Sequence, residues 1–153
     1  MKKQKKVYLN VLRKEKVPLG VWDIEEWELL IEDGPSFKSS CELLLPLNKF
    51  LVDFEPFFLK KTGFLKLDPN DGTLFIAIQK KNKSNSTLMV KENTLFEKSL
   101  FDGVFNTKYL LKVISSFFLG AVQSYAPTST EDARYIDNLK NKLQHILESI
   151  SND

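Results

Sequence analysis

The sequence predicts an α+β domain in which an antiparallel sheet of about five strands packs against three helices. Three observations predict this class. Apolar and polar residues alternate early in the chain, several short strand patterns separated by turn residues follow, and two long C-terminal stretches repeat apolar residues at helical spacing. Because consecutive short strands usually pair as neighbours, we expect an antiparallel meander with at least two helices packed on one of its faces.

The first part of the chain contains two strand patterns and one helix pattern. Residues 7–13 and 26–32 place apolar side chains at every second position, and a turn at 33–35 ends the second strand. Between residues 40 and 60 the large apolar residues recur at helical spacing. We expect this helix to stop or bend at Pro56, because the proline ring clashes inside a helix.

A hairpin is the clearest pattern in the middle of the chain. Residues 64–67 and 73–79 read as strands, and the turn residues at 68–72 lie between them. The polar stretch that follows is typical of a solvated loop. Residues 87–91 and 95–100 supply one or two further strands of the same sheet.

Two helices are predicted to close the chain. Residues 107–125 are apolar except for a narrow polar stripe, which is typical of a helix covered on most of its circumference. This stretch is too short and too often interrupted by polar residues for a membrane span. Pro127 separates it from the last helix, which begins with a capping sequence at residues 129–132.

Composition indicates one soluble, cytoplasmic domain over residues 1–153. The chain has enough large apolar residues for a full core, and residues 1–6 are expected to form a flexible basic terminus. The net charge of +2 shows no strong bias towards a polyanion. Cys41 is the only cysteine, which fits a reducing compartment, and no apolar stretch suits a secretory signal.

No catalytic or metal-binding motif is recognisable in the sequence. His145 is the only histidine and shares its predicted helix face with polar residues. A nucleophilic Cys41 would need His145, which is distant along the chain, so we expect Cys41 to be a buried or incidental cysteine. The turn at 68–72 lacks the spacing of a calcium loop. We therefore expect no catalytic residue, no metal and no cofactor. An enzyme whose site is formed only by the fold stays open as an alternative.

The stretch from Trp22 to Glu28 is the first candidate binding surface. It combines two tryptophans with four acidic residues, and aromatic and acidic side chains together are common where a protein grips a basic protein partner. Trp27 is expected to fill the core from its strand. The predicted contact residues for a protein partner are Trp22, Asp23, Glu25 and Glu26.

A set of lysines near the ends of neighbouring strands is the second candidate surface. Lysine side chains can neutralise the phosphates of a nucleic acid, although solvated loop lysines give the same pattern. The alternative function is therefore a nucleic-acid-associated protein. Its predicted contact residues are Lys60, Lys61, Lys80, Lys81 and Lys83.

Size, order of elements and the strand Trp27-Glu28-Leu29-Leu30-Ile31 together resemble small uncharacterised cytosolic proteins of low-GC Gram-positive bacteria. Some of those proteins are immunity proteins to polymorphic toxins. The resemblance covers the general layout of the chain and matches no specific motif, so no family residues are carried over. It implies a stoichiometric binder that blocks a toxin. The leading hypothesis is thus a non-enzymatic protein-binding module without a membrane partner, and the oligomeric state is left open.

Overall fold

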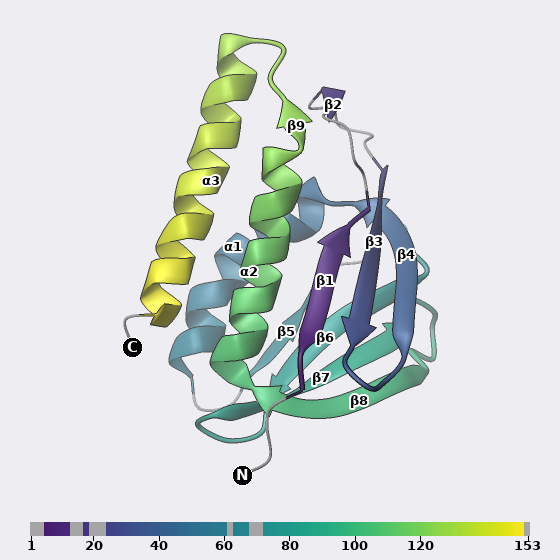
Figure 1. Cartoon of the computed structure of the whole chain (residues 1–153). Coiled ribbons are helices and arrows are strands. Elements are labelled where there is room, and N and C mark those ends of the chain that lie inside the picture. Colours follow the sequence, from purple (N-terminus) through teal and green to yellow (C-terminus); the bar gives the residue numbers. More distant parts are fainter. Residues whose placement is uncertain (1–4, 13–16, 19–23, 61–62, 68–71, 152–153) are drawn as a thin grey trace.

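The computed structural model describes residues 5–12, 17–18, 24–60, 63–67 and 72–151. Within these residues the α+β class is confirmed, with three helices beside antiparallel sheets (Figure 1). The elements are, in order, β1 (Val7–Val11), β2 (Val17–Pro18), β3 (Ile24–Ile31), β4 (Ser36–Glu42), α1 (Leu44–Leu59), β5 (Phe64–Lys66), β6 (Leu74–Lys80), β7 (Asn85–Glu92), β8 (Ser99–Asn106), α2 (Thr107–Gln123), β9 (Tyr125–Ala126) and α3 (Thr130–Ser151).

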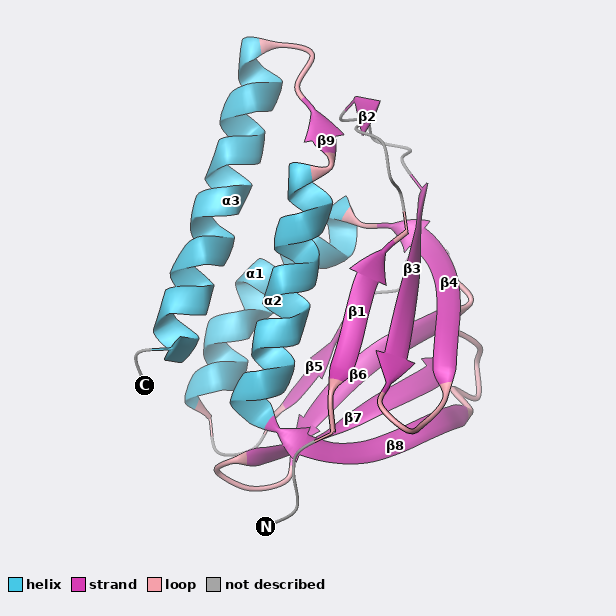
Figure 2. Ribbon diagram, viewed as in Figure 1, coloured by secondary structure: helices cyan, strands magenta, loops and turns pink. Residues whose placement is uncertain are grey.

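The strands are divided between two antiparallel sheets, whereas a single sheet was expected; the consecutive strands of the second sheet form the predicted meander. The first sheet has the order β1-β3-β4, and the second sheet has the order β5-β6-β7-β8. A short parallel pair joins β2 to β9. The division occurs where α1 follows β4 and carries the chain away before β5 begins. Figure 2 shows the first sheet crossing the second, with the three helices gathered beside them.

Strand β4 lies where the sequence predicted a loop and the start of a helix. Its core-facing side chains are Phe37, Ser39 and Cys41, so only one large apolar residue marks the inner face. Periodicity could not reveal such a strand, because its pairing with β3 holds it in place. The predicted strand at 95–100 is likewise displaced to β8, since residues 93–98 form a turn.

We expected the helix to stop or bend at Pro56; helix α1 runs through this proline to Leu59, so it does not stop there. A proline at this position leaves the carbonyl of Val52 without its helical hydrogen bond. The side chains of Val52 and Pro56 are exposed, which places this part of the helix where water can satisfy the carbonyl. The helix therefore continues for another turn.

Helix α2 is the centre of the molecule. It contacts β1 of the first sheet, β7 and β8 of the second sheet, and helix α3. Helix α1 packs against β5. The long apolar pattern of the sequence thus lies in a covered helix, as predicted. No helix in the described part of the chain is long and apolar enough to cross a membrane.

The start of α3 carries the predicted cap in a modified form. Ser129 accepts a hydrogen bond from the Asp132 backbone N–H at 3.1 Å. The Asp132 carboxylate accepts from the Thr128 hydroxyl at 2.6 Å and from its backbone N–H, and these bonds lower the pKa of Asp132. The carboxylate therefore reaches one residue further back than in a standard capping box.

Candidate binding surfaces

The predicted protein-contact residues are separated by the fold. Trp22 and Asp23 lie outside the described residues. Glu25 is 3% exposed, which corrects its assignment to the surface, while Glu26 is exposed. Strand geometry explains the difference, because Glu25 has the same parity along β3 as the core residue Trp27. Only Glu26 among the described members of this set presents its side chain to solvent.

The outer face of the first sheet keeps part of the acidic character predicted for this stretch. Glu26 and Glu28 point to the same side of β3, away from the core, and Tyr8 on β1 pairs with Leu30 on that side. Glu26 and Tyr8 are exposed. This face therefore offers acidic and aromatic groups together, but Trp27 is not among them.

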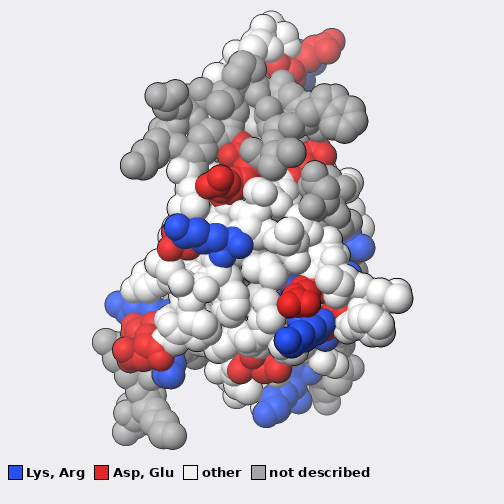
Figure 3. Space-filling view, turned by 90° about the vertical axis from the view of Figure 1, so that its right-hand side faces the viewer, with Lys and Arg blue, Asp and Glu red and all other residues white. Residues whose placement is uncertain are grey.

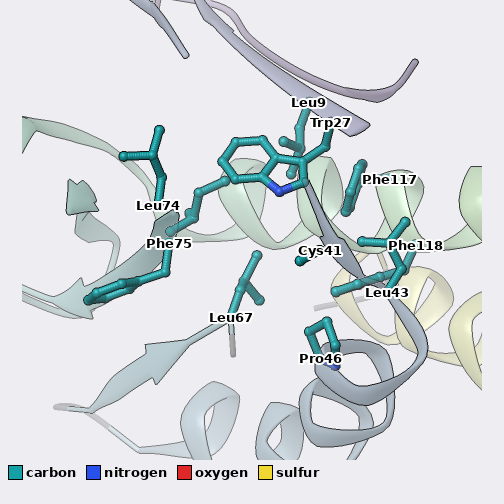
Figure 4. Close-up of a pocket in the computed structure, with 11 residues that line it drawn as sticks. Leu9, Trp27, Cys41, Leu43, Pro46, Leu67, Leu74, Phe75, Phe117 and Phe118 are labelled. Atoms are coloured by element: carbon teal, nitrogen blue, oxygen red, sulfur yellow. The ribbon is translucent and has the colours of Figure 1, made fainter. Parts of the chain in front are cut away.

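Trp27 lies beside a small cavity between the sheets and the helices (Figure 4). The cavity has a volume of about 30 Å³ and is lined by apolar side chains, including Leu9, Cys41 and Phe118. That is room for about two water molecules, and the walls offer them few hydrogen bonds. The cavity is too small for a substrate. Cys41 is buried here, as a core residue would be.

The turn between β7 and β8 presents the two most exposed large apolar side chains among the described residues. Leu95 is 91% exposed and Phe96 is 89% exposed. They are the central residues of a β-turn, closed by a hydrogen bond from the Glu97 N–H to the Thr94 carbonyl at 3.1 Å. The Leu95–Phe96 turn (residues 93–98) therefore exposes a leucine and a phenylalanine side chain to solvent.

Several contacts fix the Leu95–Phe96 turn to the body of the protein. Asn93 donates from its backbone N–H to the Thr73 carbonyl at 2.9 Å and from its side chain to the Gly72 carbonyl. Glu97 forms an ion pair with Lys66 at 3.5 Å. The Lys66 ammonium group also lies over the ring of Phe75, 4.3 Å from its centre. Glu97 adopts a φ of 46°, in the left-handed region that residues other than glycine rarely occupy. The turn is thus anchored in a strained conformation.

The same end of the second sheet meets the edge of the first sheet. Ser39 on β4 is hydrogen bonded through its hydroxyl to that of Thr73 at 3.1 Å, and Thr73 in turn accepts from Asn93. Strand β4 is one of the two outer strands of its sheet. Figure 3 looks onto this side of the molecule, where uncharged surface extends between separate acidic and basic groups.

At the opposite end of the second sheet, the fold brings predicted lysines together. Lys60, Lys80 and Lys83 line one groove with a volume of about 660 Å³, and Lys108 from α2 joins them. Lys81 is exposed but does not line the groove, and Lys61 lies outside the described residues. Phe58 and Leu59 at the end of α1 form its apolar wall. We call this feature the lysine groove.

Lys80 has a structural task within the lysine groove. Its ammonium group donates to the carbonyls of Phe58, at 3.0 Å, and Lys60, which are left without partners where α1 ends. It also lies 5.0 Å from the centre of the Phe57 ring. Burial lowers the pKa of Lys80. Sequence reasoning placed Lys80 correctly near the other lysines but could not foresee this capping role.

His145 lies on the exposed side of α3, as its helical position predicted. It borders a groove between α1 and α3 together with Glu55 and Lys142. No group of three or more histidine, cysteine, aspartate or glutamate side chains in the described part of the chain is arranged to hold a metal ion.

Comparison with known proteins identifies no family model, no curated protein and no solved structure that matches this chain. The surfaces described above are thus the basis for inferring its function. The Leu95–Phe96 turn was missed from the sequence. The sequence did contain a signal, because Leu95 and Phe96 are two adjacent large apolar residues within a polar stretch. These residues were instead assigned to the predicted strand at 95–100.

Proposed function

We propose that this chain is a protein-binding module and that the Leu95–Phe96 turn is its anchor. The observation that carries the proposal is the exposure of both side chains on an anchored turn. Burying one such side chain in a partner contributes about 1.5–3 kcal/mol. Because the turn is already ordered by its contacts with Gly72 and Thr73, little conformational entropy is lost when a partner binds.

The partner that fits these features is a protein with an apolar pocket and basic residues around it. Aromatic and apolar side chains that project from a fixed loop suit the centre of an interface, where water is excluded. The acidic groups Glu26 and Glu28 on the outer face of the first sheet support a basic partner through charge complementarity. Charged groups at such a rim act mainly on the rate of association.

The more specific proposal is an immunity-type protein of the bacterial cytoplasm that binds and blocks a toxin. Its support is the resemblance in layout noted above, together with a lone cysteine that fits a reducing compartment. In this form of the proposal the partner is an enzyme whose activity is lost in an equimolar complex. The protein itself then needs no catalytic residue.

The test is capture of the binding partner from the cells that make the protein, followed by titration calorimetry with the purified partner. We expect the double variant L95S/F96S to weaken binding at least about 100-fold, since two apolar anchors are lost. V52S is the matched control, because Val52 is also exposed, at 74%, but lies on α1. It is expected to change the dissociation constant less than about threefold.

A second variant separates the acidic face from the anchor. E26K should slow association several-fold, with an effect that shrinks at high salt, and leave the dissociation rate nearly unchanged. If L95S/F96S binds every captured protein as tightly as the wild type, the anchor is wrong. If no captured protein forms an equimolar complex, the proposed function itself is wrong.

A further inference from the structure

The lysine groove gathers four lysines, and no carboxylate is among the described residues that line it. The four are Lys60, Lys80, Lys83 and Lys108. Within the described part of the chain, Lys60 and Lys83 form no ion pair with a carboxylate. Bringing like charges together around a concave surface is unfavourable unless an anion occupies it, and the field there attracts anions.

The loop that carries Lys83 is held in place before any ligand binds. The Asn82 side chain accepts hydrogen bonds from the backbone N–H groups of Ser84 and Asn85 at 2.9 and 2.8 Å. The Ser84 carbonyl accepts from the Thr107 N–H at 2.8 Å, which ties this loop to the start of α2. The lysine groove is therefore a preorganised surface, and binding an anion there requires little ordering of the backbone.

The lysine groove also has an apolar wall. Leu59 is 72% exposed, and the ring of Phe58 is stacked on Phe54 with 5.2 Å between centroids. The groove volume of about 660 Å³ falls in the range of small-molecule sites, about 300–1,000 Å³. The lining of the groove thus combines ammonium groups with an aromatic and an aliphatic side chain.

We propose that the lysine groove binds a small phosphate ester that carries an apolar or aromatic group. The phosphate lies near Lys60 and Lys83, beside the start of α2, and the apolar group contacts Phe58 and Leu59. Lys80 keeps its bonds to the carbonyls at the end of α1 and adds its charge to the field. This site is separate from the Leu95–Phe96 turn, so the proposal of phosphate binding does not depend on the proposed protein binding.

A small ligand fits better than a nucleic acid strand because the positive charge is local. The whole chain carries only two more basic than acidic residues, 22 against 20, so a long polyanion would find little basic surface beyond the groove. A mononucleotide needs only one cluster of cations and one apolar wall. The lysine groove provides both within one concave surface.

The test is titration of the full chain with ATP and with inorganic pyrophosphate, followed by calorimetry or NMR. We expect ATP to bind and the variant K60Q/K83Q to weaken that binding about tenfold or more, since a hydrogen bond to a charged group is lost. K98Q is the matched control, because Lys98 is an exposed lysine in the turn at the other end of the second sheet. It should leave the dissociation constant for ATP unchanged.

The apolar wall is tested separately with L59S, which alters an exposed residue and should not affect folding. It should weaken the binding of ATP several-fold and leave that of pyrophosphate unchanged, because pyrophosphate has no group to contact the wall. Three results would overturn the proposal: neither anion binds the wild type, K98Q weakens binding as much as K60Q/K83Q, or a short oligothymidylate binds more than tenfold tighter than ATP through the same lysines. The last result would assign the groove to nucleic acid.

Discussion

Lys80 and Glu25 show how the environment of a single residue decides its role. In the sequence, Lys80 is one of several lysines near strand ends, yet its ammonium group caps the end of a helix that lies 20 residues earlier. Glu25 is one of several acids near a tryptophan, yet strand parity turns it towards the core. In both cases residue type alone predicted a surface contact. Direction and neighbours, which depend on the fold, assigned another task.

Removing the ammonium group of Lys80 should destabilise the fold. In K80M the aliphatic stem is retained, but the carbonyls of Phe58 and Lys60 lose their donor, so we expect a loss of about 1–2 kcal/mol in the free energy of unfolding. Urea denaturation followed by circular dichroism measures the change. K81M is the control, since Lys81 is exposed, and should stay within about 0.5 kcal/mol of the wild type. Equal stability of the two variants would show that water satisfies these carbonyls.

At the scale of elements, local sequence patterns determine the positions of some helices and strands, and tertiary pairing determines those of others. The hairpin of β5 and β6 and the helices α2 and α3 follow the predicted positions closely, because their periodicity and turn residues are strong. Strand β4 escaped prediction because its inner face carries mostly small side chains. Pro56 did not end α1, since packing of the apolar face outweighs the cost of one lost hydrogen bond.

Gly103 illustrates the packing requirement within one strand. It lies on the core-facing side of β8 between Phe101 and Phe105, and a Cβ atom there would come within 2.8 Å of the Phe101 ring. We expect G103A to lower the free energy of unfolding by about 1–3 kcal/mol, because the rings must move in a packed environment. V104A, at the exposed neighbouring position, should change it by less than about 0.5 kcal/mol. Chemical denaturation of both variants measures the difference, and equal stabilities would refute the packing explanation.

At the scale of the whole molecule, one apolar core connects the two sheets and the three helices. Its buried members include Leu9 from the first sheet, Val90 from the second, Phe50 from α1, Leu111 from α2 and Leu143 from α3. Helix α2 touches both sheets, so they share this main core, while Phe75, Ala77 and Met89 form a small separate cluster on β6 and β7. We therefore expect the described residues to unfold as one cooperative unit, with candidate binding surfaces at the two opposite ends of the second sheet.

This shared core predicts a single unfolding transition. In a W22F background, fluorescence reports on Trp27 in the core, and it should change together with the circular dichroism signal of the helices. L111A should shift both curves equally, by about 2–5 kcal/mol, because a fully buried side chain is removed from the central helix. Transitions that separate between the two probes would show that the first sheet unfolds independently of the helices.

The sequence by itself determined the α+β class, the clearest hairpin and the two C-terminal helices, because these depend on local periodicity and turn chemistry. It also placed lysines close enough along the chain to suggest a cluster. Only the tertiary structure divided the strands into two sheets, buried Glu25, and gathered the lysines around one groove with Phe58 and Leu59. Those outcomes depend on contacts between residues far apart in the chain, which no local pattern encodes.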